Sequence, residues 1–312
     1  MRIHWAVALL FAVSLRADVL VVASSGASHV TLINPLSGET LAEVPVGKGP
    51  HEVVASADGK FAWVADSGAT TVTVVDLRKR SAVKTLQLNG CGAHDLALPR
   101  SGTPLVVTCA SKKKLLEIDP WSGEELKRHA IDVEGAWMTA VSRDGARAFT
   151  ANLEGGGITG IDRESGRITT VKTAEGEIGL DITPDGGRAW LANMKTSKVT
   201  VLDARTLEVL CTFDAGAEAP MRVRFTPDGK RAVMTFGSAR KVGVYDVATR
   251  KAVQWIEIDS GSKVLAVSPD GSKAAVSAPQ KDQVTILDLL DGKVLRTISV
   301  AGKPDGVAWA GT

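Results

Sequence analysis

The most regular feature of this sequence is a short apolar run that ends in Asn or Asp and recurs seven times, at spacings of 41 to 43 residues. The runs are rich in Val, Ile, Leu and Thr, which favour strands. They occupy residues 30–34, 72–76, 115–119, 158–162, 199–203, 242–246 and 284–288. A fixed period of this length, filled with strands rather than helices, is typical of a β-propeller.

Each repeat predicts four short strands, which we call a to d in chain order. In the best-formed repeat they cover 51–56, 61–65, 71–76 and 83–88, and Asp58-Gly59 separates strands a and b. Asp-Gly between two apolar runs indicates a tight hairpin, because Gly takes the positive φ of the turn and Asp can form a local hydrogen bond. The signal returns at 144–145, 185–186, 228–229 and 270–271, with Ser-Gly at 101–102. We therefore predict blades of four antiparallel strands.

The two ends of the chain predict how the ring closes. The N-terminal repeat supplies strands b, c and d at 19–23, 30–34 and 41–46, whereas residues 305–309 form a lone strand a. Pairing them completes the last blade and removes two exposed sheet edges. The expected fold is an all-β, seven-bladed β-propeller, closed by one C-terminal and three N-terminal strands, in a single domain spanning 18–312.

Residues 1–17 lie outside the repeat and predict a signal peptide. Arg2 precedes an apolar run at 5–13 that is too short to span a bilayer but suits a signal-peptide core. We expect cleavage after Ala17, although Leu15 is larger than the residue usually found there; an uncleaved anchor is the alternative. The expected mature protein is a monomer without a membrane span, located in the periplasm or secreted.

Charge and cysteine content narrow the function classes. The chain has 37 basic and 35 acidic residues, and removal of Arg2 and Arg16 would leave 35 of each sign. A mature chain of zero net charge argues against strong non-specific nucleic-acid binding. Three cysteines are too few for a scaffold held by disulfides, so hydrophobic packing must hold the fold.

Three segments carry a resemblance to a known family. They are 63–66 (Trp-Val-Ala-Asp), 149–152 (Phe-Thr-Ala-Asn) and 190–193 (Trp-Leu-Ala-Asn), each followed by an apolar strand that ends in Asp. The pattern resembles the YVTN repeat of exported propellers, which include the YncE-like periplasmic proteins. The resemblance covers essentially the whole mature chain and implies the fold. Similar propellers bind DNA, form surface layers, open lactones or serve as subunits of quinoprotein amine dehydrogenases, so it leaves the function open.

The start of strand a predicts the functional site. If strand a lines the channel, the residues eight before each hairpin Gly share one height at the channel mouth, on the face of the d-to-a and b-to-c loops. Unlike the apolar rows beside it, this row and the next one are chemically diverse. We expect the ligand site among their polar and bulky members: His51, Glu52, His94, Asp95, Trp137, Met221, Arg222, Lys263 and Asp305.

The chemistry of this mouth allows several interpretations. His51 and His94 on neighbouring blades, beside Glu52 and Asp95, could hold a metal or a haem, or they could be ordinary rim residues that form hydrogen bonds. The chain has no catalytic triad order, zinc-binding helix, phosphate loop or dinucleotide fingerprint. We therefore expect no catalytic residue, no metal and no cofactor. The face mixes lysines and acids, so the partner could be a protein, a glycan, a nucleic acid or a small molecule.

Two further pairs are expected to be structural. Asp181 and Arg224 occupy matching positions on adjacent blades and should face each other across the inner wall. Cys91 and Cys109 fall almost opposite each other in one hairpin, so in an oxidising compartment they could form a disulfide; otherwise they are small buried hydrophobic residues. Cys211 is expected to be a lone core thiol.

Three functional hypotheses follow. The leading one is a non-enzymatic, exported binding propeller with its ligand or partner at the channel mouth. The alternative is an enzyme or enzyme subunit: a metal-dependent, lactonase-like hydrolase that uses Glu52 and Asp95, or the propeller subunit of a quinoprotein or haem dehydrogenase. A structural surface-layer or adhesion module is the third.

Overall fold

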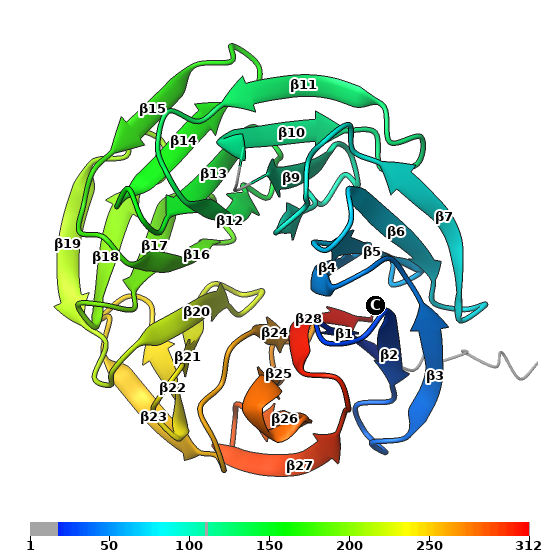
Figure 1. Cartoon of the computed structure of the whole chain (residues 1–312). Coiled ribbons are helices and arrows are strands. Elements are labelled where there is room, and N and C mark those ends of the chain that lie inside the picture. Colours follow the sequence, from blue (N-terminus) through cyan, green and yellow to red (C-terminus); the bar gives the residue numbers. More distant parts are fainter. Residues whose placement is uncertain (1–17, 110–111, 312) are drawn as a thin grey trace, which may run out of the picture.

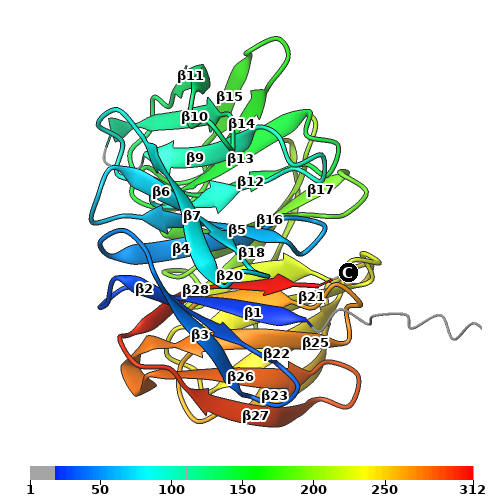
Figure 2. The ribbon, with the colours of Figure 1, turned by 90° about the vertical axis from the view of Figure 1, so that its right-hand side faces the viewer.

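The computed structural model describes residues 18–109 and 112–311. The predicted signal peptide, 1–17, lies outside the described residues. Seven sheets of four antiparallel strands surround a central channel (Figure 1). Figure 2 shows the same ring of blades from the side. The predicted seven-bladed β-propeller is confirmed. Among the described residues, no helix is long and apolar enough to cross a membrane.

The blades follow one another along the chain, and we number them from the closing blade. Blade 1 consists of β28 (Pro304–Ala310), β1 (Val19–Ser24), β2 (His29–Ile33) and β3 (Thr40–Pro45); blade 2 of β4 (Pro50–Ala55), β5 (Phe61–Asp66), β6 (Thr71–Asp76) and β7 (Ser81–Gln87); blade 3 of β8 (Leu96–Ala97), β9 (Leu105–Cys109), β10 (Lys114–Ile118) and β11 (Glu125–Ala130); blade 4 of β12 (Ala136–Val141), β13 (Arg147–Asn152), β14 (Ile158–Asp162) and β15 (Ile168–Val171).

The remaining three blades complete the ring. Blade 5 consists of β16 (Glu177–Ile182), β17 (Arg188–Asn193), β18 (Lys198–Asp203) and β19 (Val209–Asp214); blade 6 of β20 (Pro220–Phe225), β21 (Arg231–Phe236), β22 (Lys241–Asp246) and β23 (Ala252–Glu257); blade 7 of β24 (Leu265–Val267), β25 (Lys273–Ala278), β26 (Gln283–Asp288) and β27 (Lys293–Ser299). The short helix η2 (Pro279–Lys281) connects β25 and β26.

The hydrophobic core lies between neighbouring blades. All six residues of β6 are buried, as expected for a third strand that is covered on both faces. Its Val74 belongs to one apolar cluster with Leu96 and Leu116 of blade 3. The Asp at the end of the strand serves the turn: Asp76 Oδ1 accepts hydrogen bonds from the backbone N–H groups of Arg78 and Lys79. The recurring Asp is therefore explained by local structure.

The closing seam pairs β28 with β1, as predicted. The register joins Val22 to Val307 and Val19 to Ala310, antiparallel. Next to this seam the backbone of β28 approaches β4 so closely that a Cβ atom at Gly306 would lie 2.3 Å from the carbonyl oxygen of His51 and 2.7 Å from Glu52 Cα. Both obstacles include main-chain atoms, which cannot rotate away. A glycine is therefore required at position 306.

We expect Gly306→Ala to lower the free energy of unfolding by about 1–3 kcal/mol, because the added methyl group must push β28 away from β4. Chemical denaturation would measure the change. Gly92→Ala is the matched control, since a Cβ at Gly92 would have its nearest neighbour at 3.5 Å. Equal stability of the two variants would show that the seam can absorb a side chain.

The innermost strands of blades 3 and 7 are shorter than those of the other blades, and that of blade 3 is the shortest. Here β8 contains only two residues, yet His94 N–H still donates to Thr108 O and Thr108 N–H to Asp95 O. Cys91 and Cys109 form a disulfide across this hairpin, with their Cα atoms 5.2 Å apart. The bond joins the segment before β8 to the end of β9. Cys211 is a free, half-buried thiol.

Candidate functional site

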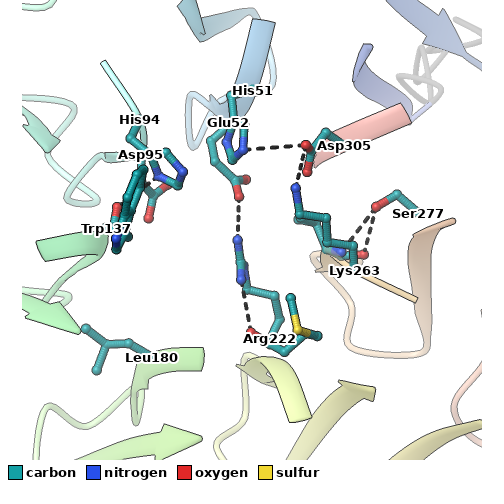
Figure 3. A network of polar contacts seen from close by, with 12 residues as sticks. His51, Glu52, His94, Asp95, Trp137, Leu180, Arg222, Lys263, Ser277 and Asp305 are labelled. Carbon is teal, nitrogen blue, oxygen red and sulfur yellow. Dashed lines mark hydrogen bonds and ion pairs between the residues drawn. The ribbon is translucent and has the colours of Figure 1, made fainter. Parts of the chain in front are cut away.

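The channel mouth brings together side chains from six blades. His51 and Glu52 lie on β4, Trp137 on β12, Arg222 on β20 and Asp305 on β28. The loop before β8 supplies His94 and Asp95, and the loop before β24 supplies Lys263. Figure 3 shows these side chains converging on the channel axis.

An ion pair spans the channel just inside the mouth. The Nη2 atom of Arg222 lies 2.8 Å from Glu52 Oε1, and the two side chains are 1% and 5% exposed. Their blades, 6 and 2, are not neighbours in the ring, so the pair crosses the axis (Figure 3). Burial acts to raise the pKa of Glu52, but the charge of Arg222 and its hydrogen bond outweigh burial and lower it. Glu52 is therefore ionised at neutral pH, and the pair forms a floor under the mouth.

A second charged group lies at the junction of blades 7, 1 and 2. Asp305 Oδ2 lies 2.6 Å from Lys263 Nζ and 3.5 Å from His51 Nε2. Burial lowers the pKa of His51 more than the nearby Asp305 raises it, so this imidazole is neutral at neutral pH. Asp305 Oδ1 and His51 Nδ1 are buried and have no hydrogen-bond partner in the described part of the chain. Two buried polar atoms beside the mouth thus lack a protein partner.

Three aromatic rings form a row along one side of the mouth. The ring centroids of His51 and His94 are 4.1 Å apart, and those of His94 and Trp137 are 4.6 Å apart, edge to face. Burial, followed by the charge of His51, lowers the pKa of His94 to about 3. Because His94 Nδ1 lies 3.1 Å from the Trp137 carbonyl oxygen, the neutral ring carries its proton there. Trp137 Nε1 donates to Glu154 Oε2 at 2.7 Å.

Asp95 is buried and binds backbone amides of two blades. Its two carboxylate oxygens accept backbone N–H groups from Leu96 and Thr139, each at 2.7 Å, and so tie blade 3 to blade 4. Burial and the charge of Glu52 raise the pKa of Asp95 to about 7. Asp95 is only 3% exposed, and its carboxylate lies inside the channel wall.

Asp181 and Arg224 are close but bind backbone rather than each other. Asp181 Oδ1 and Oδ2 accept the N–H groups of Ile182 and Phe225, at 2.9 Å each. Arg224 Nη1 donates to two carbonyl oxygens, one of them that of Leu180. Within 18–109 and 112–311 the two side chains form no direct ion pair, but while burial raises the pKa of Asp181, the charge of Arg224 acts to lower it. The two residues therefore interact across the inner wall, in a structural role.

The most metal-like arrangement in the described residues consists of His51, Glu52 and Asp305. Their donor atoms lie within 4.8 Å of one another. Both carboxylates are, however, already neutralised by cations: Glu52 by Arg222 and Asp305 by Lys263. A divalent cation would have to displace at least one of these.

Sequence reasoning missed one residue of the mouth. Glu154 belongs to the loop between β13 and β14 and fixes the indole of Trp137. Its repeat position carries no constant residue type, so only its distance from the tryptophan reveals it.

Met221, which was predicted at the mouth, lies half-buried beside Gly237, where a Cβ atom would be 3.3 Å from the methionine sulfur.

Fold and site together define a β-propeller whose channel is crossed by a buried ion pair just below a polar, aromatic mouth. Residues 111–309 match the family described as outer membrane protein assembly factor BamB, and the chain belongs to this family. Its relatives include the uncharacterized protein YncE of Salmonella typhimurium, 26% identical over 248 residues, which are 74% of this chain and 69% of YncE. YncE of Salmonella typhi is 25% identical over the same shares. The YncE-like resemblance expected from the repeats is confirmed.

Solved structures share the fold. A functionally unknown protein from Desulfotomaculum acetoxidans superposes with a TM-score of 0.81 at 14% identity, covering 94% of this chain and 98% of its own. A hydrazine synthase chain of Kuenenia stuttgartiensis gives a TM-score of 0.71 at 18% identity, with 81% and 87% covered. At these identities the likeness concerns architecture alone.

Proposed function

We propose that this chain is an exported, non-enzymatic binding propeller that holds a small polar ligand, or one end of a larger partner, at the channel mouth. The row of His51, His94 and Trp137 carries the proposal, because it offers aromatic faces and edges beside a charged group. The Glu52–Arg222 floor supports a shallow site that receives a ligand from one side. Membership of a family described as an assembly factor also favours binding over catalysis.

The arrangement gives a ligand three kinds of contact. Lys263 is 30% exposed and can share its charge between Asp305 and an acceptor on the ligand. The neutral imidazole of His94, whose Nδ1 proton is bonded to the Trp137 carbonyl oxygen, can accept one hydrogen bond at Nε2. Trp137, whose ring is anchored through Glu154, offers a surface for stacking. A planar, polar ligand would use all three.

A ligand screen by ¹⁹F NMR on protein labelled with 5-fluorotryptophan tests the proposal. We expect a member of a panel of nucleoside monophosphates, aromatic amino acids and oligosaccharides to shift the Trp137 resonance, assigned through Trp137→Phe. His94→Ala should weaken that binding roughly tenfold, since it removes the central ring of the row. Trp121→Phe, an exposed tryptophan elsewhere on the molecule, should leave it unchanged. Shifts confined to other tryptophans would place the ligand elsewhere and refute the proposal.

A metal-dependent hydrolase is a second candidate, favoured by the close donor atoms of His51, Glu52 and Asp305. Elemental analysis of protein purified without chelators separates the two. About one divalent metal per chain, lost in His51→Ala, would support the hydrolase. Metal-free protein that still binds its ligand would support the binding propeller.

A further inference from the structure

The opposite end of the channel contains a cavity of about 400 Å³. It lies where the innermost strands end and turn outward, on the face away from the mouth described above. Its walls come from blades 1, 2, 3, 4 and 7. The lining is mixed: Ala55, Leu98, Val141, Pro269 and Trp309 supply apolar surface, and Ser56 and two arginines supply polar surface.

Two arginines are the only charged residues in this lining. Arg100 follows the end of blade 3's innermost strand, and Arg143 occupies the corresponding turn of blade 4. Both side chains are exposed, and neither makes a hydrogen bond or ion pair with another described residue. No carboxylate lines the cavity. Arg100 and Arg143 therefore have no carboxylate partner among the described residues, and the nearby Asp18 is engaged by the Trp309 indole.

The fold itself does not require arginine at these two positions. Each a-to-b turn places one residue directly before its Asp-Gly or Ser-Gly pair, and this residue is Ala57, Arg100, Arg143, Pro184, Pro227 or Pro269. In blade 5 the turn is closed by the Gly186 N–H bonding to Thr183 O, which makes this the second turn position, where proline is favoured. Arginine therefore replaces the residue that best suits the turn, and it does so only in two adjacent blades.

The two arginine-bearing turns are in contact. A Cβ atom at Gly145, in the turn of blade 4, would lie 3.2 Å from Cβ of Pro99, the residue before Arg100. The nearest acid in these turns, Asp144, is occupied, because its Oδ1 accepts the Ser142 hydroxyl at 2.6 Å and the Ala146 N–H at 2.9 Å. The positive charge at this end is thus concentrated and not neutralised by its own turns.

We infer that this cavity is a second site, separate from the mouth, that binds a small organic anion through Arg100 and Arg143. A carboxylate or a phosphate matches the planar guanidinium fork, which can bind either with two parallel hydrogen bonds. The body of the ligand would pack against Leu98, Val141 and Trp309. The Trp309 indole is held in place by its Nε1 donating to Asp18 Oδ2 at 2.8 Å.

Ligand-observed ¹⁹F NMR of the full mature chain tests the inference with three probes of similar size: 4-fluorobenzoate, 4-fluorophenyl phosphate and the neutral 4-fluorobenzyl alcohol. We expect at least one anion to bind and the alcohol to bind at least roughly tenfold more weakly. The double variant Arg100→Gln/Arg143→Gln should lower the affinity for the anion by a similar factor. Arg100→Lys/Arg143→Lys should fall between, because it keeps the charge but loses the fork.

The matched control is Arg167→Gln/Arg205→Gln. These two exposed arginines lie on the outer turns of the same face, so their removal changes the net charge equally without touching the cavity. Anion binding that is equal in both double variants, or binding of the alcohol as tight as that of the anions, would overturn the inference. His94→Ala should leave anion binding intact, so failure here and failure of the mouth proposal are distinguishable. Unchanged thermal unfolding would verify that each variant is folded.

Discussion

Replacing Arg222 with methionine is expected to lower the free energy of unfolding by about 3–5 kcal/mol, because it leaves the buried carboxylate of Glu52 without a counter-charge. Both side chains are almost fully buried, so water cannot take over the role of the guanidinium. Equilibrium unfolding in guanidinium chloride at pH 7 measures the change, with the midpoint and slope compared to those of the unchanged chain.

The double variant Glu52→Gln/Arg222→Met distinguishes the cost of leaving one charge unpaired from the contribution of the ion pair itself. It removes both charges and should recover much of the stability lost in the single variant, since a buried ion pair contributes less than its disruption costs. Arg128→Met, which breaks the exposed pair with Glu125, is the control and should change stability little. A small loss in Arg222→Met, equal to that of the control, would contradict a buried cross-channel pair.

The pH dependence of this effect has a definite sign. Arg222 holds the pKa of Glu52 below its ordinary value in the folded protein, despite burial. Such a carboxylate contributes stability above the pKa of the unfolded chain, and the contribution disappears as the pH falls through the folded-state pKa. The difference between Arg222→Met and the unchanged chain should therefore narrow in acid, where Glu52 is protonated.

Removing the disulfide with Cys91→Ala/Cys109→Ala should lower the free energy of unfolding by about 3 kcal/mol. The bond closes a loop between residues 18 apart in sequence, and its loss returns conformational entropy to the unfolded chain. It also releases the segment before the two-residue strand β8 from the end of β9. Chemical denaturation, with and without dithiothreitol, would measure the effect.

Two comparisons support the interpretation of that experiment. Dithiothreitol should destabilise the unchanged chain and have no effect on the double variant. Cys211→Ala, which removes the free thiol of blade 5, should not reproduce the loss. If dithiothreitol leaves the unchanged chain as stable as before, the bond does not contribute in solution.

The fold could be predicted because its determinants are local and periodic. The Asp or Asn that ends each third strand caps its own turn, as Asp76 and Asn34 do, and each Asp-Gly pair marks a hairpin. The closing strand followed from counting, since one strand was missing at one end and one was left over at the other. The shortening of β8, and of β24 in blade 7, was not predicted, because no change in the apolar pattern marks it.

The sequence placed the mouth side chains at one height but could not show which of them contact one another. Counting from the hairpin glycines placed His51, His94 and Lys263 at one level, and the structure brings them together there. The counting could not show that Arg222 reaches Glu52 on the far side of the ring, because that depends on the channel diameter and the length of the side chain. Nor could it show that Asp95 binds backbone amides across a blade boundary.

The far cavity was overlooked for a different reason. Arg100 and Arg143 lie in turns whose residues are explained by hairpin geometry, so a sequence reader assigns them no role. Only the shared cavity, assembled from five blades, reveals that their side chains meet one environment.

Because β1 pairs with β28, the propeller can close only when the whole chain is present. Since Val22 of β1 pairs with Val307 of β28, the inner edge of β1 stays unpaired until the last strand of the chain has been synthesised. A chain interrupted before that point would present two open strand edges, which invite pairing with other chains. Proteases or chaperones could then recognise truncated copies without a dedicated signal, because the absence of β28 leaves strand edges exposed.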